Sequence, residues 1–422
     1  MLRECDVLVI GGGPAGLAAA VGAARAGARV TLLERLGSLG GLASSGMVGT
    51  VCGLYARAAD GPGAVVNAGL CTQFARRLSD AAGTSPIRTP GDLWILPHTS
   101  WAFERVADAY VEEHPQIELA LLGVAHTAHT DGRLVTRVDA LVWNQAVSFA
   151  PRAVIDCTGE ATAATLAGAE TEDLGDTMAT SAIFTIDGVD TTLDPRALQL
   201  AALRDIARGV EEETLPPSSR HLTVVPAVNA PGQALVKVVL PSVTRDSWNR
   251  ASHLALEARR QAEILCAHLR ARCAPFREAR IGQMAEQIGI RLGRSAVGRA
   301  ALTEEDVLAC RRSPDGVAVG AWPMEEWDAD RGLRIEPLPE GGTYDIPLGC
   351  LRARDLDNLW MAGRCLSATA RALASARVIG TALATGFAAG TAAAMTLRGE
   401  SEKTIINSLR AVPESSPVSP AS

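Results

Sequence analysis

The hydrophobic and polar positions near the start of the chain follow a strand-like pattern, then a helix-like one, then a strand-like one again. An apolar run, Asp6–Ile10, leads into the glycine-rich Gly11–Gly13, and small apolar residues follow over Pro14–Ala26. A second apolar run, Arg29–Leu33, comes directly after them. Short apolar runs bounded by glycine are typical of buried strands, and the longer small-residue stretch is typical of a helix. The pattern predicts a strand–helix–strand unit with parallel strands.

Between residues 117 and 158 the pattern changes to short alternating runs. Leu134–Val138 and Ala146–Phe149 are each preceded by a short turn-forming dipeptide, Asp-Gly in one case and Asn-Gln in the other. Alternation of apolar and polar residues between such turns is typical of antiparallel strands. We therefore predict a small antiparallel meander, closed by the apolar Ala153–Ile155.

Residues 169–341 follow a pattern that differs from the segments on either side. They contain a strand-like run, Ser181–Ile186, and a long helix-like stretch, Arg245–Arg272, with prolines clustered between such runs. Prolines in these places are typical of loops. The pattern predicts a mixed α+β segment inserted between two parts of another domain.

One long stretch near the end of the chain carries no charge. No Asp, Glu, Lys or Arg occurs between Arg377 and Arg398, and this length could span a bilayer. Most of its residues are Ala, Gly and Thr, however, and its strongly apolar side chains are too few to drive membrane insertion. We therefore predict a buried helix here. Residues 401–422 end in Ser- and Pro-rich sequence and are predicted to be mobile.

The composition narrows the class of protein. The 422 residues are 47% apolar and 21% charged, as in globular proteins. The formal net charge is −7 and no run of Lys or Arg occurs, so neither a nucleic acid nor a membrane surface is an expected partner. The nine Cys form no C-x-x-C pair, which favours reduced thiols over a zinc site. Because the N-terminal residues also lack a signal-peptide pattern, we expect a cytoplasmic protein without a metal site.

The glycines of the first turn have the spacing of a nucleotide-binding site. Gly11-x-Gly13-x-x-Gly16 lies between the first predicted strand and helix, where backbone N–H groups can approach a pyrophosphate that a Cβ would block. Glu34 ends the second predicted strand, where a carboxylate can accept hydrogen bonds from an adenosine ribose. Together these features predict a Rossmann-type dinucleotide-binding unit.

This motif by itself does not separate NAD from FAD, and three further segments favour FAD. The doublet Gly40-Gly41 would let the chain pass close to the pyrophosphate and ribityl groups. An apolar strand ends in a Thr-Gly turn at Gly159, and another ends at Gly363 before a predicted helix. The N-terminus of such a helix would stabilise negative charge on a reduced flavin. No second glycine-rich unit follows, so a built-in NAD(P)H domain is not predicted.

These segments resemble the FAD-dependent oxidoreductase family that shares its nucleotide fold with glutathione reductase and fumarate reductase flavoproteins. Other segments that carry the resemblance are Gly289–Arg291, Leu302–Val307, Tyr344–Pro347 and Asn358–Gly390. Relatives often carry histidines at positions corresponding to 324–328 and 370–371, where this chain has none. A proton-transfer role at those positions therefore cannot be carried over.

The predicted fold is α/β, with a Rossmann-type FAD-binding domain, a small antiparallel meander and an inserted α+β substrate domain. Residues 1–168 and 342–400 are assigned to the FAD-binding domain, 169–341 to the insertion and 401–422 to the tail. The resemblance also implies which residues contact FAD. They are Gly11, Gly13, Pro14, Ala15, Gly16, Glu34, Arg35, Gly41, Leu42, Gly159, Gly363, Arg364, Val378 and Ile379.

Four side chains are candidates for contact with the substrate. Cys52 follows the glycine doublet and is either a reactive thiol or a packed wall of the flavin site. Arg291 and Arg294 have the spacing of neighbours on one helix face, where they would bind an anionic group or pair with nearby acids. Arg377 precedes the uncharged helix and is carried by the resemblance as a cation beside the flavin or substrate.

The leading functional hypothesis is a flavoenzyme with non-covalent FAD that moves a hydride between a small organic substrate and the flavin. An anionic substrate is favoured by the arginines and by the scarcity of aromatic residues, which make up 4% of the chain. Two alternatives stay open, a flavin-dependent monooxygenase that uses NAD(P)H and O2, and a non-catalytic FAD-binding assembly or sensor protein. The sequence predicts neither the identity of the substrate nor the oligomeric state.

Overall fold

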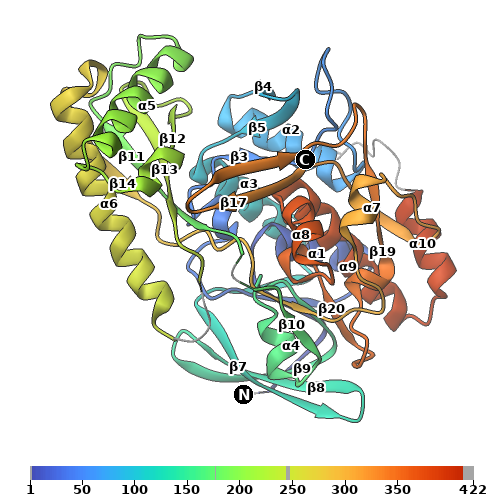
Figure 1. Cartoon of the computed structure of the whole chain (residues 1–422). Helices are drawn as coiled ribbons and strands as arrows, with labels where there is room; N and C mark the ends of the chain where they lie inside the picture. Colours follow the sequence, from blue (N-terminus) through green and yellow to red (C-terminus); the bar gives the residue numbers. More distant parts are fainter. Residues whose placement is uncertain (1, 176, 244–247, 412–422) are drawn as a thin grey trace, which may run out of the picture.

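A seven-stranded sheet runs through the computed structural model, which describes residues 2–175, 177–243 and 248–411 (Figure 1). The strand order is β6-β2-β1-β9-β8-β7, and β20 also pairs with β9. The parallel part of the sheet consists of β6 (Ile117–Ala120), β2 (Val30–Leu33), β1 (Leu2–Ile10), β9 (Gln145–Asp156) and β20 (Leu359–Met361).

Helix α1 (Pro14–Arg25) connects β1 to β2, as the apolar pattern predicts. Strands β7 (Gly123–Asp131) and β8 (Leu134–Val142) join β9 in the predicted antiparallel meander. The α/β fold class is therefore confirmed. One detail differs, because β6 pairs in parallel with β2 instead of beginning the meander at residue 117. Its main-chain groups extend the central sheet at the edge that β2 would otherwise leave open.

The uncharged stretch forms α9 (Ile379–Leu397), which lies against α1 (Figure 1). Glycines allow this close approach, since an added Cβ would lie 2.0 Å from the Ala15 carbonyl oxygen at Gly386 and 2.0 Å from that of Ala19 at Gly390. Among the described residues, α9 is the one helix whose length and hydropathy would suit a membrane span, yet 83% of it is buried within the protein. It is the core helix that the sequence predicts.

We expect the substitution Gly386→Ala to destabilise the protein by about 1–3 kcal/mol, the usual cost of overpacking a core. Alanine favours a helix over glycine by about 1 kcal/mol, but its methyl group would collide with main-chain atoms of α1 that cannot rotate away. Urea unfolding of the variant measures the difference. Ser252→Ala, at an exposed position of another helix, is the control and should leave the unfolding midpoint unchanged. An unchanged midpoint for Gly386→Ala would mean that α1 and α9 can separate without cost.

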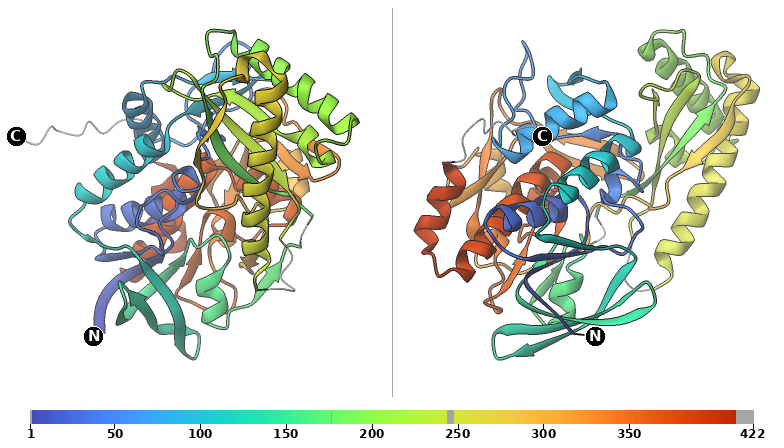
Figure 2. Two further views of the ribbon diagram at one scale, coloured as in Figure 1. Left: turned by 90° about the vertical axis from the view of Figure 1, so that its left-hand side faces the viewer. Right: turned by 180° about the vertical axis from the view of Figure 1, so that it is seen from behind.

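A second, antiparallel sheet has the order β12-β13-β11-β14, formed by Thr223–Pro226, Gln233–Leu240, Thr180–Asp187 and Arg280–Met284. One face is covered by α5 (Pro195–Glu211) and α6 (Arg250–Arg272), and the sheet and these two helices share a hydrophobic core of their own. In Figures 1 and 2 these helices lie on the side of the molecule opposite α10 (Glu402–Arg410).

The predicted strand Ser181–Ile186 is thus found within β11, and the predicted long helix begins at Arg250. Arg245, at which the predicted helix begins, lies outside the described residues, which leave out 244–247. The domain limits at 168, 341 and 400 stay a prediction.

The remaining elements lie outside these two sheets. The strands are β3 (Thr50–Val51), β4 (Ile87–Thr89), β5 (Leu93–Pro97), β10 (Thr171–Asp173), β15 (Arg294–Ala296), β16 (Gly316–Gly320), β17 (Met324–Asp328), β18 (Gly332–Glu336) and β19 (Tyr344–Pro347). The helices are α2 (Leu70–Ala82), α3 (Ser100–Glu112), α4 (Thr162–Leu166), α7 (Glu304–Leu308), α8 (Ala370–Ala376) and α10 (Glu402–Arg410).

Helix α10 corrects the prediction of a mobile tail that begins at residue 401. Ser401 caps this helix by accepting a hydrogen bond from the Thr404 N–H group, and Ile405 is buried against the main core. A capping serine and one buried apolar side chain therefore stabilise a helix here, although the segment is mostly polar. The rest of the predicted tail, residues 412–422, lies outside the described residues.

Candidate flavin and substrate site

The turn between β1 and α1 has the close packing that a phosphate-binding turn requires. A Cβ at Gly16 would lie 1.7 Å from the Gly11 carbonyl oxygen, and one at Gly11 would lie 2.5 Å from the Cys157 carbonyl oxygen. Gly11 also has a φ of 102°, which disfavours residues with a side chain. These two glycines are thus needed by the turn itself, whatever it binds.

Gly13 is required for a different reason. A Cβ added there would meet no protein atom within 4 Å, and Gly13 is the residue that caps the N-terminus of α1. The next residue, Pro14, has no N–H group, whereas the N–H groups of Ala15 and Gly16 belong to the first turn, which has no partners within its helix. The open space at Gly13 thus lies where these donors and the helix dipole favour an anion.

Glu34 lies beside this turn, at the end of β2. Its side chain is 5% exposed, and its two oxygens accept hydrogen bonds from the N–H groups of Gly12 (2.5 Å) and Leu36 (2.8 Å). Each carboxylate oxygen can accept more than one hydrogen bond, so the group can still receive a ribose hydroxyl. Arg35, in contrast, is exposed and donates to Gln287 (2.5 Å).

Other predicted FAD contacts converge on the same turn. Gly40 donates a hydrogen bond to the Gly12 carbonyl (2.9 Å), and a Cβ at Gly41 would lie 3.2 Å from the Cα atom of Gly13. Leu42, next in the chain, is half-buried. On the other side, a Cβ at Gly363 would lie 2.8 Å from the Cβ atom of Ala15.

Arg364 packs over Gly159, where an added Cβ would lie 2.9 Å from Arg364 Nη2. The same Nη2 atom is 2.7 Å from Glu160 Oε1. Asp156 stabilises the Thr158–Gly159 turn, because its carboxylate accepts hydrogen bonds from Thr158 N (3.0 Å) and Oγ1 (2.7 Å). The open space at Gly13, the buried acid at the end of β2 and the glycines on either side fit the adenosine and pyrophosphate groups of FAD.

The predicted substrate side lies at the start of α9. Val378 caps this helix and Ile379 is its first residue. Gly380 donates a hydrogen bond to the Cys52 carbonyl (2.9 Å), so the Cys52 loop packs directly on the helix N-terminus. Burial, reinforced by the charge of Glu325, raises the pKa of the Cys52 thiol to about 12. The thiol is therefore protonated at neutral pH, which favours a wall of the site over a reactive thiolate.

The prediction that Arg291 and Arg294 share a helix face is wrong. Arg291 lies in the loop between β14 and β15, and Arg294 begins β15, where it donates to the Thr165 hydroxyl (3.2 Å). A helix cannot form here, because the main-chain groups of Gly289 and Gly293 bond instead to Ser181 and Leu174. Arg291 is 7% exposed and donates to the Ala179 carbonyl, so it belongs to the site while Arg294 does not.

Arg291 contacts the Trp327 ring and interacts electrostatically with Lys237 and Glu325, three side chains that sequence reasoning missed. The guanidinium carbon of Arg291 lies 5.0 Å from the centre of the Trp327 ring, and Lys237 Nζ lies 3.8 Å from it. Both distances are in the range of cation–π contacts. One signal could have revealed Lys237, since it is a single charge within an otherwise apolar strand sequence, Ala-Leu-Val-Lys-Val-Val-Leu.

Glu325 is the anion of this cluster. Its two oxygens accept hydrogen bonds from the indole N–H groups of Trp327 (2.5 Å) and Trp322 (2.9 Å). Arg377 donates to the Glu325 carbonyl oxygen (3.2 Å), and its Nε atom is buried without a hydrogen-bond partner among the described residues. We call Lys237, Arg291, Glu325 and Arg377 the charge cluster.

The pKa values show that the charge cluster holds excess positive charge in a poorly solvated place. Burial, together with the charge of Arg291, lowers the pKa of Lys237 to about 8. Burial and the charge of Arg377 lower the pKa of Arg291 to about 9, and burial also lowers that of Arg377. Burial by itself would raise the pKa of Glu325, but Arg377, Lys237 and the two indoles lower it. Three cations thus surround one carboxylate, which suits an added anion.

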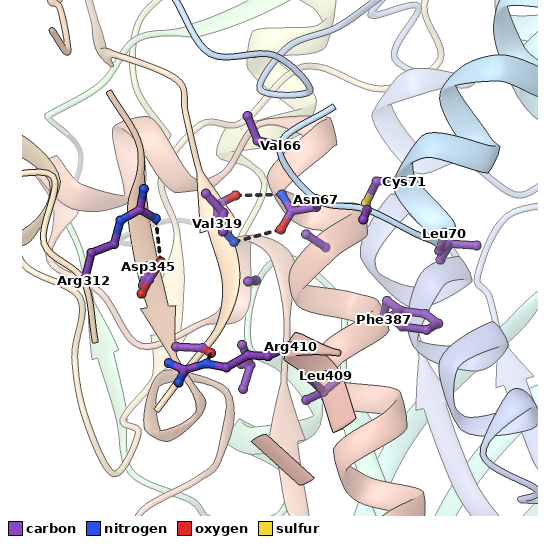
Figure 3. Close-up of a pocket in the computed structure, with 15 residues that line it drawn as sticks. Val66, Asn67, Leu70, Cys71, Arg312, Val319, Asp345, Phe387, Leu409 and Arg410 are labelled. Atoms are coloured by element: carbon purple, nitrogen blue, oxygen red, sulfur yellow. Dashed lines mark hydrogen bonds and ion pairs between the residues drawn. The ribbon is translucent and has the colours of Figure 1, made fainter. Parts of the chain in front are cut away.

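A separate cavity of about 340 Å³ shares no lining residue with the charge cluster or with the glycine turn (Figure 3). Its polar side chains are used within the protein. Asn67 exchanges two hydrogen bonds with the main chain of Val319 (2.8 and 2.9 Å), and Arg312 pairs with Asp345 (2.9 Å). We therefore assign no role in the reaction to this cavity.

Comparison with known proteins supports the assignment of the glycine turn. A sequence model of the family described as FAD dependent oxidoreductase matches residues 6–412. A search of curated protein sequences gave no match.

Among solved structures, the p-nitrophenol 4-monooxygenase PnpA from Pseudomonas putida DLL-E4 has a TM-score of 0.51 at 12% identity, over 96% of this chain and 84% of that one. The anhydrotetracycline hydroxylase OxyS from Streptomyces rimosus has a TM-score of 0.51 at 14% identity, over 97% of this chain and 65% of its own length. At these identities the similarity shows a shared fold. The family match and the geometry together show that the chain belongs to the FAD dependent oxidoreductase family and is an enzyme that uses FAD.

Proposed function

We propose that the enzyme oxidises or reduces a small anionic substrate by hydride transfer to or from FAD. The observation that carries this proposal is the charge cluster, in which Arg291, Arg377 and Lys237 surround the single carboxylate of Glu325. A buried N–H group without an acceptor is rare in folded proteins, and Arg377 Nε has no acceptor within the part of the chain that the structure describes. A carboxylate on the substrate would supply the missing acceptor and balance the excess charge.

FAD, when bound, supplies the two-electron acceptor or donor. The residues of the chain supply binding and orientation. Arg291 and Arg377 would hold the carboxylate of the substrate, and the fixed pairing of Glu325 with two indoles would keep the cluster in place. Trp322 and Trp327 are both buried, so they exclude water from one side of the site and strengthen its electrostatic interactions.

Reduction of the flavin under anaerobic conditions tests the proposal. We expect one or more small carboxylates to bleach the flavin absorbance, and the corresponding methyl esters to do so at least tenfold more slowly because they lack the charge. Rapid bleaching by neutral compounds as well as by acids would contradict the role of the charge cluster.

A flavin-dependent monooxygenase reaction is the second candidate, because hydroxylases share this fold. The same experiment separates the two. A monooxygenase would be reduced by NAD(P)H and not by its organic substrate, and it would then transfer an atom of labelled O2 to the product. Three expectations stay predictions. They are the resemblance to glutathione reductase and fumarate reductase flavoproteins, the cytoplasmic location, and the absence of nucleic-acid and membrane partners.

A further inference from the structure

Lysine is exceptionally rare in this chain. Only Lys237 and Lys403 occur among 422 residues, whereas 38 residues are arginines. Arginine supplies a permanent charge and serves almost every other cationic position here. Lysine differs from arginine in that its amine can lose a proton when it is buried. A lysine at position 237 therefore suggests a task that arginine cannot perform.

The position of Lys237 directs its amine towards the charge cluster. On β13, Val236 and Val238 are buried in the core beneath α5 and α6. Side chains alternate along a strand, so Lys237 lies on the opposite face, where its Nζ atom is 3.8 Å from the centre of the Trp327 ring. Lys237 Nζ donates no hydrogen bond to any of the described residues. Its side chain is half-buried, so part of it stays exposed at the surface.

Charged and titratable groups face this amine from four separate segments. They are Arg291 from the loop after β14, Glu325 from β17, Cys52 from the loop after β3 and Arg377 from the end of α8. Burial lowers the pKa of Lys237 most strongly, the two arginines lower it further, and Glu325 and Cys52 oppose them. Because the resulting pKa is about 8, roughly a tenth of Lys237 is a neutral amine at pH 7, and about half is neutral at pH 8.

We propose that Lys237 is the proton acceptor of the reaction and that the substrate is a 2-hydroxy acid. Its carboxylate would bind Arg291 and Arg377, which places its hydroxyl group beside the free amine. An amino group on the substrate would be an ammonium ion and would be repelled by the arginines, so a hydroxyl group fits better. This inference rests on the proposed hydride transfer.

The step balances as an oxidation of the alcohol. The O–H bond would break and its proton would go to Lys237 Nζ, while the hydrogen on the adjacent carbon would leave as a hydride and a C=O bond would form. Bound FAD would supply the two-electron acceptor for this hydride, and Lys237 would later return the proton to water. General base catalysis of this kind typically contributes a factor of about 10² to 10⁴ in rate.

The presence of only two lysines makes a direct measurement possible. Selective ¹⁵N labelling of lysine in the FAD-loaded enzyme should give two side-chain resonances, and Lys403, exposed on α10, serves as the internal control. We expect the Lys237 amine to titrate near pH 8, the value to which burial lowers its pKa, and the Lys403→Arg variant assigns the two resonances. A Lys237 amine that stays protonated up to pH 10 would overturn the proposal.

Variants test the catalytic role separately. We expect Lys237→Arg and Lys237→Met to keep their FAD and their melting temperatures, but to be reduced by 2-hydroxy acids about 10² to 10⁴ times more slowly. Added small primary amines should restore part of the rate in Lys237→Ala, and Lys403→Arg should behave as the wild type. If Lys237→Arg reacts within tenfold of the wild type, Lys237 is not the base although the proposed function stands. If no 2-hydroxy acid reduces the flavin of the wild-type enzyme, the assignment of the substrate fails. The proposed hydride transfer is then tested separately, by anaerobic reduction with small carboxylic acids that are not 2-hydroxy acids.

Discussion

Replacing Gly13 with alanine is expected to remove FAD from the enzyme without weakening the fold. The methyl group would meet no protein atom within 4 Å, and Gly13 has a φ of −68°, which alanine adopts without strain. The same methyl group would point into the open space beside the first-turn N–H groups of α1, where the pyrophosphate is expected. We expect the affinity for FAD to fall by at least 10²-fold, because displacement of a phosphate from such donors costs several charge-assisted hydrogen bonds.

The measurement is FAD binding to the apoenzyme by fluorescence quenching, with the melting temperature of the apoenzyme as a second readout. Gly16→Ala is the matched comparison. Its methyl group would lie 1.7 Å from the Gly11 carbonyl oxygen, so it should lower the melting temperature even in the absence of FAD. If Gly13→Ala binds FAD as tightly as the wild type does, the pyrophosphate does not occupy the space beside Gly13.

The second large effect is expected for Glu325→Gln. This change would remove the one carboxylate that the described residues place among the cations Lys237, Arg291 and Arg377, while the amide could still accept a hydrogen bond from one of the indoles. No ion pair joins Glu325 to a cation among the described residues, so the change would remove one charge-assisted indole hydrogen bond and the longer-range attraction to the three cations. A hydrogen bond to a charged group is worth about 1.5–3 kcal/mol, and we expect a loss in this range in urea unfolding at pH 7. Glu305→Gln, at an exposed position of α7, is the control.

The pH dependence gives a further check on Glu325. Its pKa in the folded protein is lower than the usual 4.5, so its stabilising effect is fully present above pH 4.5 and is lost as the pH falls through the folded pKa. The difference in stability between the wild type and Glu325→Gln should therefore shrink on acidification below pH 4.5. A difference that stays constant between pH 7 and pH 3 would mean that the carboxylate charge does not hold the cluster together.

Some residues of the charge cluster could be predicted from the sequence, and others could not. Arg377 was found because it precedes a helix with a recognisable small-residue pattern. Arg291 was found, but its predicted helix was wrong, since the hydrogen bonds of Gly289 and Gly293 to distant segments override the local pattern. Lys237 and Glu325 lie on strands of different sheets, and nothing in their local sequence shows that the two strands face each other.

The sequence by itself determined the parts of this protein whose interactions are local. Gly11, Gly13 and Gly16 have to form a tight turn before a helix, Glu34 ends the next strand, and the small-residue pattern of residues 379–397 makes a buried helix. The glycine turn and the position of Glu34 depend on residues within about 25 positions of each other. The buried helix follows from the general preference of small apolar side chains for a protein core. Only the tertiary structure decided the substrate side, because Cys52, Lys237, Arg291, Glu325 and Arg377 are brought together from across 326 positions of the chain. Their altered pKa values arise from shared burial, a property of the assembled site that no single segment carries.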